Sequence, residues 1–169
     1  MKRLLSKILF VIFINGWLLK AEALVPYFYF PTLKNLERES LSIAKNAYQL
    51  LYFGQIEDSL NLAKLAVQIY KSDEKLWLIL SETQIANKLY DEALLSLKNA
   101  QKINSNLSEI YFAESNIYLK RKQLINAEDA LKKGLKIDPN NHKAIFQLGN
   151  IFLMKKDYST AINSFDKAV

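Results

Sequence analysis

The sequence contains no cysteine and only one histidine, His142. The lack of cysteine excludes a disulfide framework, a thiolate metal site, a cysteine nucleophile and an attached lipoprotein anchor. A single histidine argues against a histidine-based zinc site and against a catalytic triad. Glycine and proline are also scarce, with four and three copies in 169 residues. This scarcity argues against a β-sandwich or barrel with many tight turns and favours helices.

Motifs that carry common enzyme chemistry are missing as well. The sequence has no G-x-G-x-x-G, P-loop, H-E-x-x-H or G-x-S-x-G pattern. Three pairs of adjacent carboxylates are present, and we expect them at or near helix starts, where negative charge complements the helix dipole. These pairs are Glu57-Asp58, Asp91-Glu92 and Glu128-Asp129. We therefore predict a protein that is not an enzyme and that holds no cofactor or metal.

The formal net charge is +6, and only three of the 23 basic residues are arginines. Proteins that read nucleic acids rely on arginine forks, and no basic stripe with interleaved aromatic residues is present. Half of the residues are apolar and 24% are charged, which is typical of a folded protein. Because arginines are few and no basic stripe is present, we predict that the chain binds no nucleic acid.

Residues 1–23 have the order of a secretory signal peptide. A basic start precedes an apolar run from Ile8 to Leu19, and the small-residue pattern Ala21-Glu22-Ala23 follows it. The run is shorter than the roughly 20 residues that a membrane-spanning helix needs. The alternative is an uncleaved membrane anchor that uses Leu4 to Leu19. Both interpretations place the rest of the chain on the non-cytoplasmic side, because the basic residues stay inside.

A short aromatic segment follows this leader. Four aromatic residues, Tyr27 to Phe30, lie between Pro26 and Pro31, and the two prolines exclude a helix there. We interpret the segment as a strap over the open end of the first helix pair. The alternative is a contact of its aromatic rings with the membrane interface. Residues 33–39 are expected to extend the first helix of the folded part backward.

A period of 34 residues runs through residues 40–169 without gaps, with starts at Ser40, Glu74, Ser108 and His142. Counted from these starts, positions 8, 20 and 27 carry Ala, Ser or Gly in every copy. The residues are Ala47, Ser81, Ser115 and Gly149 at position 8, Ser59, Ala93, Ala127 and Ala161 at position 20, and Ala66, Ala100, Gly134 and Ala168 at position 27.

This spacing predicts pairs of antiparallel helices, because two helices approach closely only where their side chains are small. We expect positions 8 and 20 to meet within one hairpin and position 27 to meet the next hairpin. Large apolar residues at positions 4, 11, 17 and 24 then fill the remaining space. The segment Asp138-Pro139-Asn140-Asn141 is predicted to be a turn in which proline stops one helix and Asn140 or Asn141 caps the next.

The pattern resembles the tetratricopeptide repeat (TPR) family over residues 40–169. The resemblance implies an all-α fold, an α-solenoid of antiparallel helical hairpins (a TPR superhelix) with a concave inner groove, here preceded by an N-terminal hydrophobic helix. The residues that carry it are Trp77, Leu80, Ala93, Leu97 and Ala100 in the second repeat, Tyr118, Ala127 and Pro139 in the third, and Leu148, Gly149, Ala161, Phe165 and Ala168 in the fourth.

The chain then divides into a signal peptide or membrane anchor (1–23), an aromatic strap with a lead-in helix (24–39) and four repeats. The repeats are TPR 1 at 40–73, TPR 2 at 74–107, TPR 3 at 108–141 and an incomplete TPR 4 at 142–169. Val169 is only position 28 of its repeat. We therefore expect that the natural chain is longer or that this end frays.

In TPR domains the groove is lined by positions 2, 5, 9, 12 and 13 of each first helix. Here these positions combine an apolar floor with polar groups, which suits an extended or helical peptide whose backbone Asn116 and Asn150 can bond. The alternative is that another layer of the same chain fills the groove. The candidate partner-binding residues are Tyr48, Tyr52, Leu78, Glu82, Phe112, Asn116, Phe146 and Asn150.

The chaperone-binding branch of the family holds a C-terminal carboxylate with a clamp of Lys, Asn and Arg. The matching positions here lack that clamp, which argues against the binding of chaperone tails. They carry Ala44, Tyr48, Leu78, Glu82 and Ala113.

We predict a non-enzymatic TPR scaffold, exported or membrane-anchored, that binds a peptide or partner protein in its groove. Residues 23–55 also resemble the start of thylakoid TPR proteins of cyanobacteria and plastids associated with photosystem I assembly. That resemblance implies that the partner is a photosystem subunit or assembly intermediate and that the protein lies at the thylakoid. Without that resemblance, an exported chain is expected in the periplasm. The alternatives are a self-associating cell-envelope protein and the docking arm of a larger enzyme that continues past residue 169. The sequence does not predict the oligomeric state.

Overall fold

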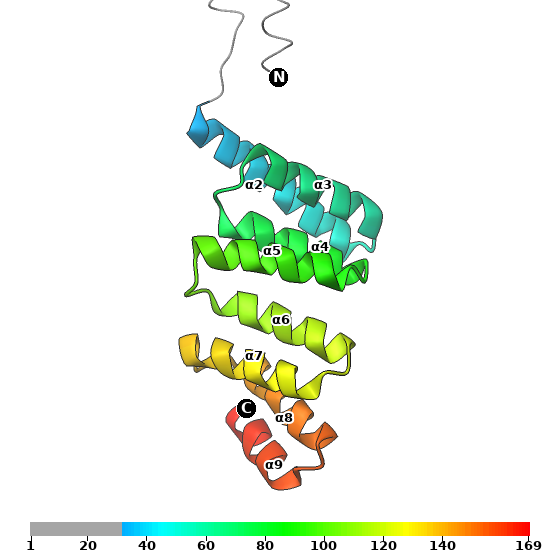
Figure 1. Cartoon of the computed structure of the whole chain (residues 1–169), viewed down its shortest axis with the longest axis vertical. Coiled ribbons are helices and arrows are strands. Elements are labelled where there is room, and N and C mark those ends of the chain that lie inside the picture. Colours follow the sequence, from blue (N-terminus) through cyan, green and yellow to red (C-terminus); the bar gives the residue numbers. More distant parts are fainter. Residues whose placement is uncertain (1–31) are drawn as a thin grey trace, which may run out of the picture. The chain divides into compact units, whose positions relative to one another are not determined.

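The computed structural model describes residues 32–169, in which every regular element is a helix. The predicted leader at 1–23 and the aromatic segment at 24–31 lie outside the described residues. The helices alternate in direction and pair as hairpins, so the all-α prediction is confirmed (Figure 1). They are α2 (Leu33–Tyr52), α3 (Ile56–Ile69), α4 (Glu74–Ala86), α5 (Tyr90–Ile103), α6 (Ser108–Lys120), α7 (Leu124–Ile137), α8 (His142–Met154) and α9 (Tyr158–Lys167).

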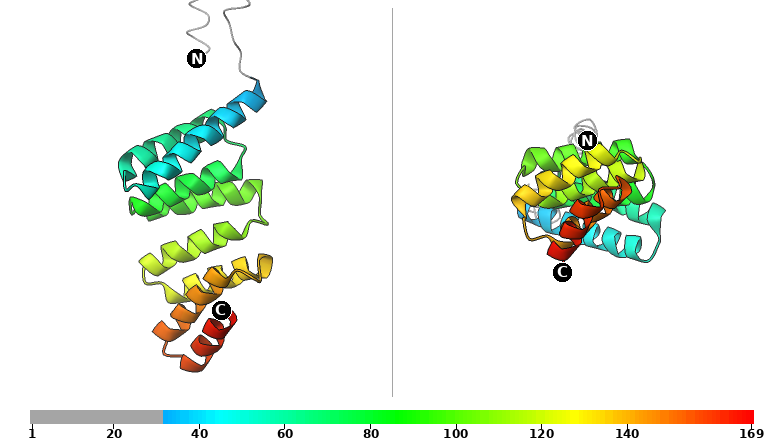
Figure 2. Two further views of the ribbon diagram at one scale, coloured as in Figure 1. Left: turned by 180° about the vertical axis from the view of Figure 1, so that it is seen from behind. Right: turned by 90° about the horizontal axis from the view of Figure 1, so that it is seen from below.

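Within residues 33–169 the four hairpins stack in sequence order. The second helix of each hairpin packs against the first helix of the next, as α3 does against α4. The first helices also contact one another, α2 with α4 and α4 with α6. A view from behind shows the same succession (Figure 2). None of the helices in this part of the chain combines the length and the apolar character that crossing a bilayer requires.

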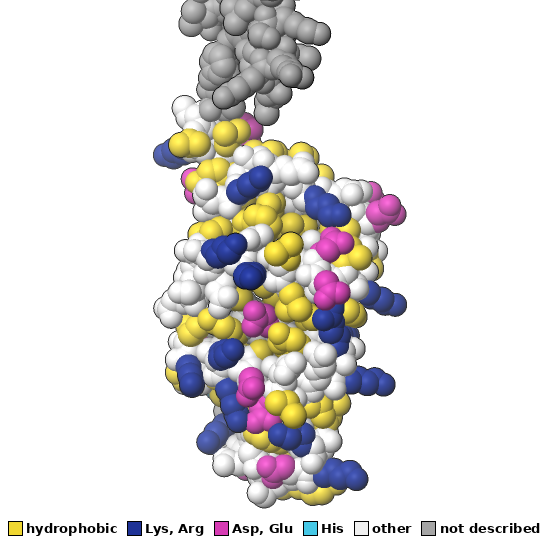
Figure 3. Space-filling view, in the orientation of Figure 1, with side chains coloured by type: hydrophobic (Ala, Val, Ile, Leu, Met, Phe, Trp, Pro, Cys, Tyr) yellow, Lys and Arg dark blue, Asp and Glu magenta, His cyan; other side chains and the backbone are white. Residues whose placement is uncertain are grey.

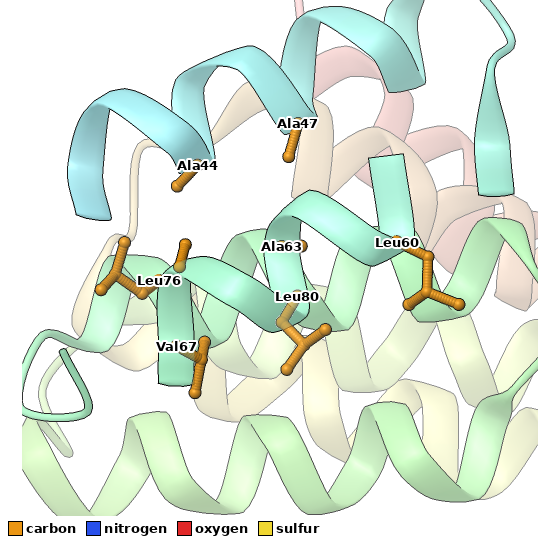
Figure 4. Close-up of a cluster of buried hydrophobic side chains, with 8 residues drawn as sticks. Ala44, Ala47, Leu60, Ala63, Val67, Leu76 and Leu80 are labelled. Atoms are coloured by element: carbon orange, nitrogen blue, oxygen red, sulfur yellow. The ribbon is translucent and has the colours of Figure 1, made fainter. Parts of the chain in front are cut away.

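Small side chains occupy the helix contacts, as predicted. Eleven of the twelve residues at positions 8, 20 and 27 are buried, and Ala168, in the last hairpin, is half-buried. The Oγ atom of Ser59 (position 20) donates a hydrogen bond of 2.7 Å to the carbonyl oxygen of Ala47 (position 8). This bond shows that positions 8 and 20 meet within the first hairpin. In Figure 4, Ala47 points from α2 toward the helix that carries Ala63.

Two of the small sites are glycines that lie against aromatic rings. A Cβ atom added at Gly149 would lie 2.6 Å from the ring of Phe165, and one added at Gly134 would lie 2.3 Å from the ring of Phe112. Each ring belongs to the same hairpin as its glycine. Gly134 is at position 27 of its repeat, and the spacing predicts a contact of this position with the next hairpin. The side chain closest to Gly134 is instead that of Phe112, in its own hairpin.

The turn inside each hairpin has the same backbone shape in all four copies. Position 15 adopts a left-handed conformation, with φ of 77° at Gly54, 62° at Lys88, 58° at Lys122 and 65° at Lys156. The next residue donates its N–H to the carbonyl five residues earlier, for example Leu89 to Gln84 at 2.8 Å. This is the Schellman arrangement that ends a helix. Position 15 is a glycine only in the first repeat, so the identity of this residue does not predict the left-handed turn in the other three repeats.

Side-chain caps begin α4, α8 and α9, and the first two of these helices start between hairpins. Asp73 accepts a hydrogen bond of 2.7 Å from the N–H of Lys75 at the start of α4. Asn141 accepts one of 3.0 Å from the N–H of Ala144 at the start of α8, as the predicted turn at 138–141 required. At α9, inside the last hairpin, Asp157 is the cap.

We expect Ala93→Leu to lower the free energy of unfolding by about 1–3 kcal/mol. Ala93 is fully buried in the contact of α4 with α5, so a larger side chain must push the helices apart. Urea unfolding followed by the helical circular dichroism signal measures the change. Lys98→Leu, on the exposed face of the same helix, is the control and should unfold near the wild-type urea concentration. Equal midpoints for the two variants would contradict the packing argument.

Candidate functional site

Two adjoining hollows lie between the first helices of successive hairpins, each with a volume of about 280 Å³. The first, which we call the tyrosine hollow, lies between α2, α4 and α6. Its lining residues are Tyr48, Leu51, Tyr52, Glu82, Ile85 and Asn116. The second, the phenylalanine hollow, lies between α4, α6 and α8. Its apolar lining consists of Ile85, Phe112, Ala113 and Ala144, and its polar lining of Glu82, Glu109, Asn116, Asn141, Lys143 and Gln147.

The two hollows share Glu82, Ile85 and Asn116. These residues form a common wall, so that one ligand can lie across both hollows. Apolar surface remains accessible beside this wall, since Tyr48 is 53% exposed and Tyr52 is 84% exposed. The two hollows therefore form a continuous surface over the first three hairpins and the start of the fourth.

Five of the eight candidate residues line these hollows: Tyr48, Tyr52, Glu82, Phe112 and Asn116. They come from α2, α4 and α6, which are neighbours in the stack.

The structure does not place the other three candidates, Leu78, Phe146 and Asn150, at either hollow. Leu78 is half-buried and packs against the core cluster around Leu97. Phe146 is 51% exposed, and its ring centroid lies 5.1 Å from that of Phe165 in α9. Asn150 is exposed on α8.

Several lining residues are not among the sequence candidates. Leu51 and Ile85 are at position 12, and Glu109 and Lys143 are at position 2. Both positions belong to the groove pattern that the family resemblance implies, so applying that pattern at every position would have included them. Ala113 and Gln147 are at position 6, which the pattern does not contain.

Several polar side chains on the hollows have no intramolecular hydrogen-bond partner in the described part of the chain, among them Asn116, Gln147, Glu82 and Lys143. The carboxamides of Asn116 and Gln147 make no hydrogen bond to another described residue, and neither does the carboxylate of Glu82. By contrast, the carboxamide of Gln84, on the other side of α4, accepts a hydrogen bond of 2.7 Å from Ser96. The side chains of Asn116, Gln147 and Glu82 are thus available to a ligand.

Glu82 is accessible to water, yet it lies among protein atoms at the shared wall of the hollows. This partial desolvation raises the pKa of the Glu82 carboxyl above its ordinary value, and the positive charge of Lys143 opposes the rise only in part. Lys143 does not form an ion pair with it, and no other described residue does. Glu82 is therefore a partly desolvated acid that forms no ion pair with another described residue.

Two family models described as tetratricopeptide repeat match the sequence, one over residues 108–141 and the other over residues 130–163. Residues 108–163 of this chain therefore match tetratricopeptide repeats. Proteins of this kind are interaction scaffolds that bind proteins or peptides and are typically not enzymes. A search among curated proteins finds no significant match.

Solved structures of TPR proteins have the same fold. TTC0263, a thermophilic TPR protein of Thermus thermophilus, is 19% identical with a TM-score of 0.71, over 80% of this chain and 79% of that one. MamA from Desulfovibrio magneticus RS-1 is 19% identical with a TM-score of 0.66, over 80% and 79%. YrrB, described as a TPR protein with an unusual peptide-binding site, is 17% identical with a TM-score of 0.58, over 75% and 65%.

Charges on the second helices of the TPR hairpins follow the helix dipole. Glu57 and Asp58 lie in the first turn of α3, and Asp91 and Glu92 in the first turn of α5. Lysines lie in the last turns of α5, α7 and α9. Figure 3 shows both signs of charge interspersed with apolar side chains on one face. The first two carboxylate pairs are thus where the sequence predicted them.

Glu128 of the third carboxylate pair lies further into α7 and joins two TPR hairpins. Its oxygens accept hydrogen bonds from Lys132 at 2.6 Å and from Lys155 at 2.7 Å, and its side chain is 11% exposed. These hydrogen bonds, from Lys132 first and then Lys155, hold the pKa of the Glu128 carboxyl below its ordinary value. Lys155 follows α8, so the fourth hairpin is tied to the third.

The same position joins the second and third hairpins. Arg121, like Lys155, is position 14 of its repeat, and its guanidinium lies 2.7 Å from the Asp91 carboxylate of the preceding hairpin. It also lies 5.6 Å from the centre of the Tyr90 ring. Position 14 thus supplies an ionic contact between neighbouring TPR hairpins.

We expect Glu128→Gln to lower the free energy of unfolding at neutral pH by about 1–2 kcal/mol. The folded pKa of Glu128 is below its unfolded value. Its contribution is therefore complete above the unfolded pKa of about 4.3 and is lost as the pH falls through the folded pKa. Urea unfolding of both chains, at neutral pH and at about pH 3, measures the difference, which should shrink in acid. The control is the exposed neighbour Asp129→Asn, and an equal loss in both variants would contradict the assignment.

Proposed function

We propose that this TPR protein binds an extended or helical segment of a partner protein across the tyrosine and phenylalanine hollows. The observation that carries the proposal is the combination of unpaired polar groups with accessible apolar surface. Glu82, Asn116 and Gln147 make no hydrogen bonds within the described chain, and they lie beside Tyr52 and Phe112.

The chemistry of an extended peptide fits this combination. Its backbone N–H and C=O groups need partners when they leave water, and a carboxamide offers both a donor and an acceptor. Its apolar side chains can cover the accessible aromatic surface of the hollows. YrrB, which shares the fold, is described as having a peptide-binding site, and we extend that mode of binding to this chain.

Heptapeptides selected from a random phage-displayed library on the full chain, held in detergent micelles, test the proposal. We expect the double variant Asn116→Ala/Gln147→Ala to bind the selected peptides at least about tenfold more weakly, because their backbone loses hydrogen bonds. Isothermal titration measures the affinities. Asn150→Ala is the matched control, since Asn150 is an exposed asparagine of α8 outside the hollows. An unchanged affinity of the double variant, with its unfolding midpoint also unchanged, would rule out binding at this site.

We further propose that the chain is exported or membrane-anchored through residues 1–23, with the repeats on the non-cytoplasmic side. The support is the basic, apolar and small-residue order of that segment. The resemblance of residues 23–55 to thylakoid TPR proteins supports the narrower proposal that the partner is a photosystem I subunit or assembly intermediate.

N-terminal sequencing of the protein from fractionated cells tests the location. We expect either a start at Leu24 in a non-cytoplasmic soluble fraction, after cleavage, or a start at Met1 in the membrane fraction. A start at Met1 in the cytoplasmic fraction would contradict both forms of the proposal. Crosslinking in the native membrane tests the partner, and recovery of neighbours other than photosystem I subunits would contradict the narrower proposal.

A further inference from the structure

Glu82, the acidic side chain at the shared wall, faces a lysine on one of the two hollows but no described basic residue on the other. Glu82 lines both hollows, but among the residues that the structure describes Lys143, on the phenylalanine hollow, is the one lysine or arginine that lines either of them. On the tyrosine hollow the other lining residues are apolar or neutral. The Glu82 carboxylate therefore lacks a cation on the side of Tyr48 and Tyr52.

The other lining residues of the tyrosine hollow also favour a cation. Tyr48 and Tyr52 contribute two aromatic rings to the same hollow as Glu82. The face of an aromatic ring attracts an ammonium or guanidinium group, and this attraction adds to that of a nearby carboxylate. The stem of a Lys or Arg side chain is apolar, so it can pack on Leu51 and Ile85 while its charged end reaches Glu82.

The phenylalanine hollow differs in character. Phe112, Ala113 and Ala144 give it an apolar lining, and Asn116 and Gln147 place carboxamides at its surface. These groups suit an apolar side chain together with the adjoining peptide backbone. Because the hollows share a wall, two nearby residues of one segment can fill them at the same time.

We infer that the partner segment carries an Arg or Lys close to an apolar residue, with the cationic group in the tyrosine hollow against Glu82 and the apolar side chain in the phenylalanine hollow. This inference rests on the proposed function and specifies the chemistry of the ligand. A cation beside Glu82 also offsets the desolvation that raises the pKa of its carboxyl.

The phage-selected heptapeptides bound to the full chain provide the test, followed by synthetic peptides in which arginine is replaced by citrulline, its neutral isostere. We expect Arg or Lys to be enriched in the selected peptides. Replacement by citrulline should weaken binding to the wild type about tenfold. The same replacement of arginine by citrulline should change the affinity of the peptide for the Glu82→Gln variant by less than about twofold. Glu82 is exposed to solvent, so the unfolding midpoint of this variant should match the wild type.

Glu114→Gln is the matched control. Burial raises the pKa of the Glu114 carboxyl and the nearby Lys133 opposes the rise, as with Glu82 and Lys143, but Glu114 lines neither hollow. This variant should keep the full tenfold difference between the arginine and citrulline peptides.

The outcomes separate this inference from the proposed function. Selected peptides without cationic residues, or an equal effect of citrulline on the wild type and on Glu82→Gln, overturn the inference. If such peptides still require Asn116 and Gln147, the proposed function stands without it. If no peptide binds the full chain, or if the bound peptides are insensitive to every change in the hollows, both are overturned.

Discussion

Helices in this chain approach one another closely because small side chains, Ala, Ser and Gly, recur at their contacts. Eleven of the twelve Ala, Ser and Gly residues at positions 8, 20 and 27 are buried, and at Gly134 and Gly149 even one added methyl group would overlap a phenylalanine ring. The period of 34 residues repeats this contact, so each hairpin presents the same faces to the next. The first helices α2, α4 and α6 consequently lie side by side, and the surface between them is a product of core packing.

The surface that results carries side chains that the fold does not use for its own stability. Some polar groups elsewhere are engaged, such as Ser59 with the Ala47 carbonyl and Gln84 with Ser96. Asn116 and Gln147, in contrast, have no partner among the described residues. This division between a packed side and an unsatisfied side is what makes the scaffold suited to binding.

Charged residues contribute mainly to the joints between hairpins. The residue at position 14 bonds a carboxylate of the preceding hairpin in two successive copies, Arg121 with Asp91 and Lys155 with Glu128. The neighbouring position 15 is in the left-handed backbone region in all four copies, although three of them are lysine. A left-handed lysine costs backbone energy that glycine avoids, and the two hydrogen bonds of the Schellman turn offset part of that cost. The hairpin turn is therefore set by the ends of the two helices and not by local residue preference.

The sequence by itself determined the helical class, the period and the small-residue contacts, because steric exclusion at a repeated contact leaves a direct trace in residue size. It also indicated the helix cap at Asn140 or Asn141, where a short polar side chain acts on its own backbone neighbourhood. Only the tertiary structure decided which members of the implied groove meet. Leu78 packs toward the core and Phe146 pairs with Phe165, whereas Ile85, Lys143 and Gln147 join the hollows. These placements arise within one hairpin for Phe146 and Phe165, and between successive hairpins for the hollows. They depend on the sum of many contacts, which no single position in a repeat encodes.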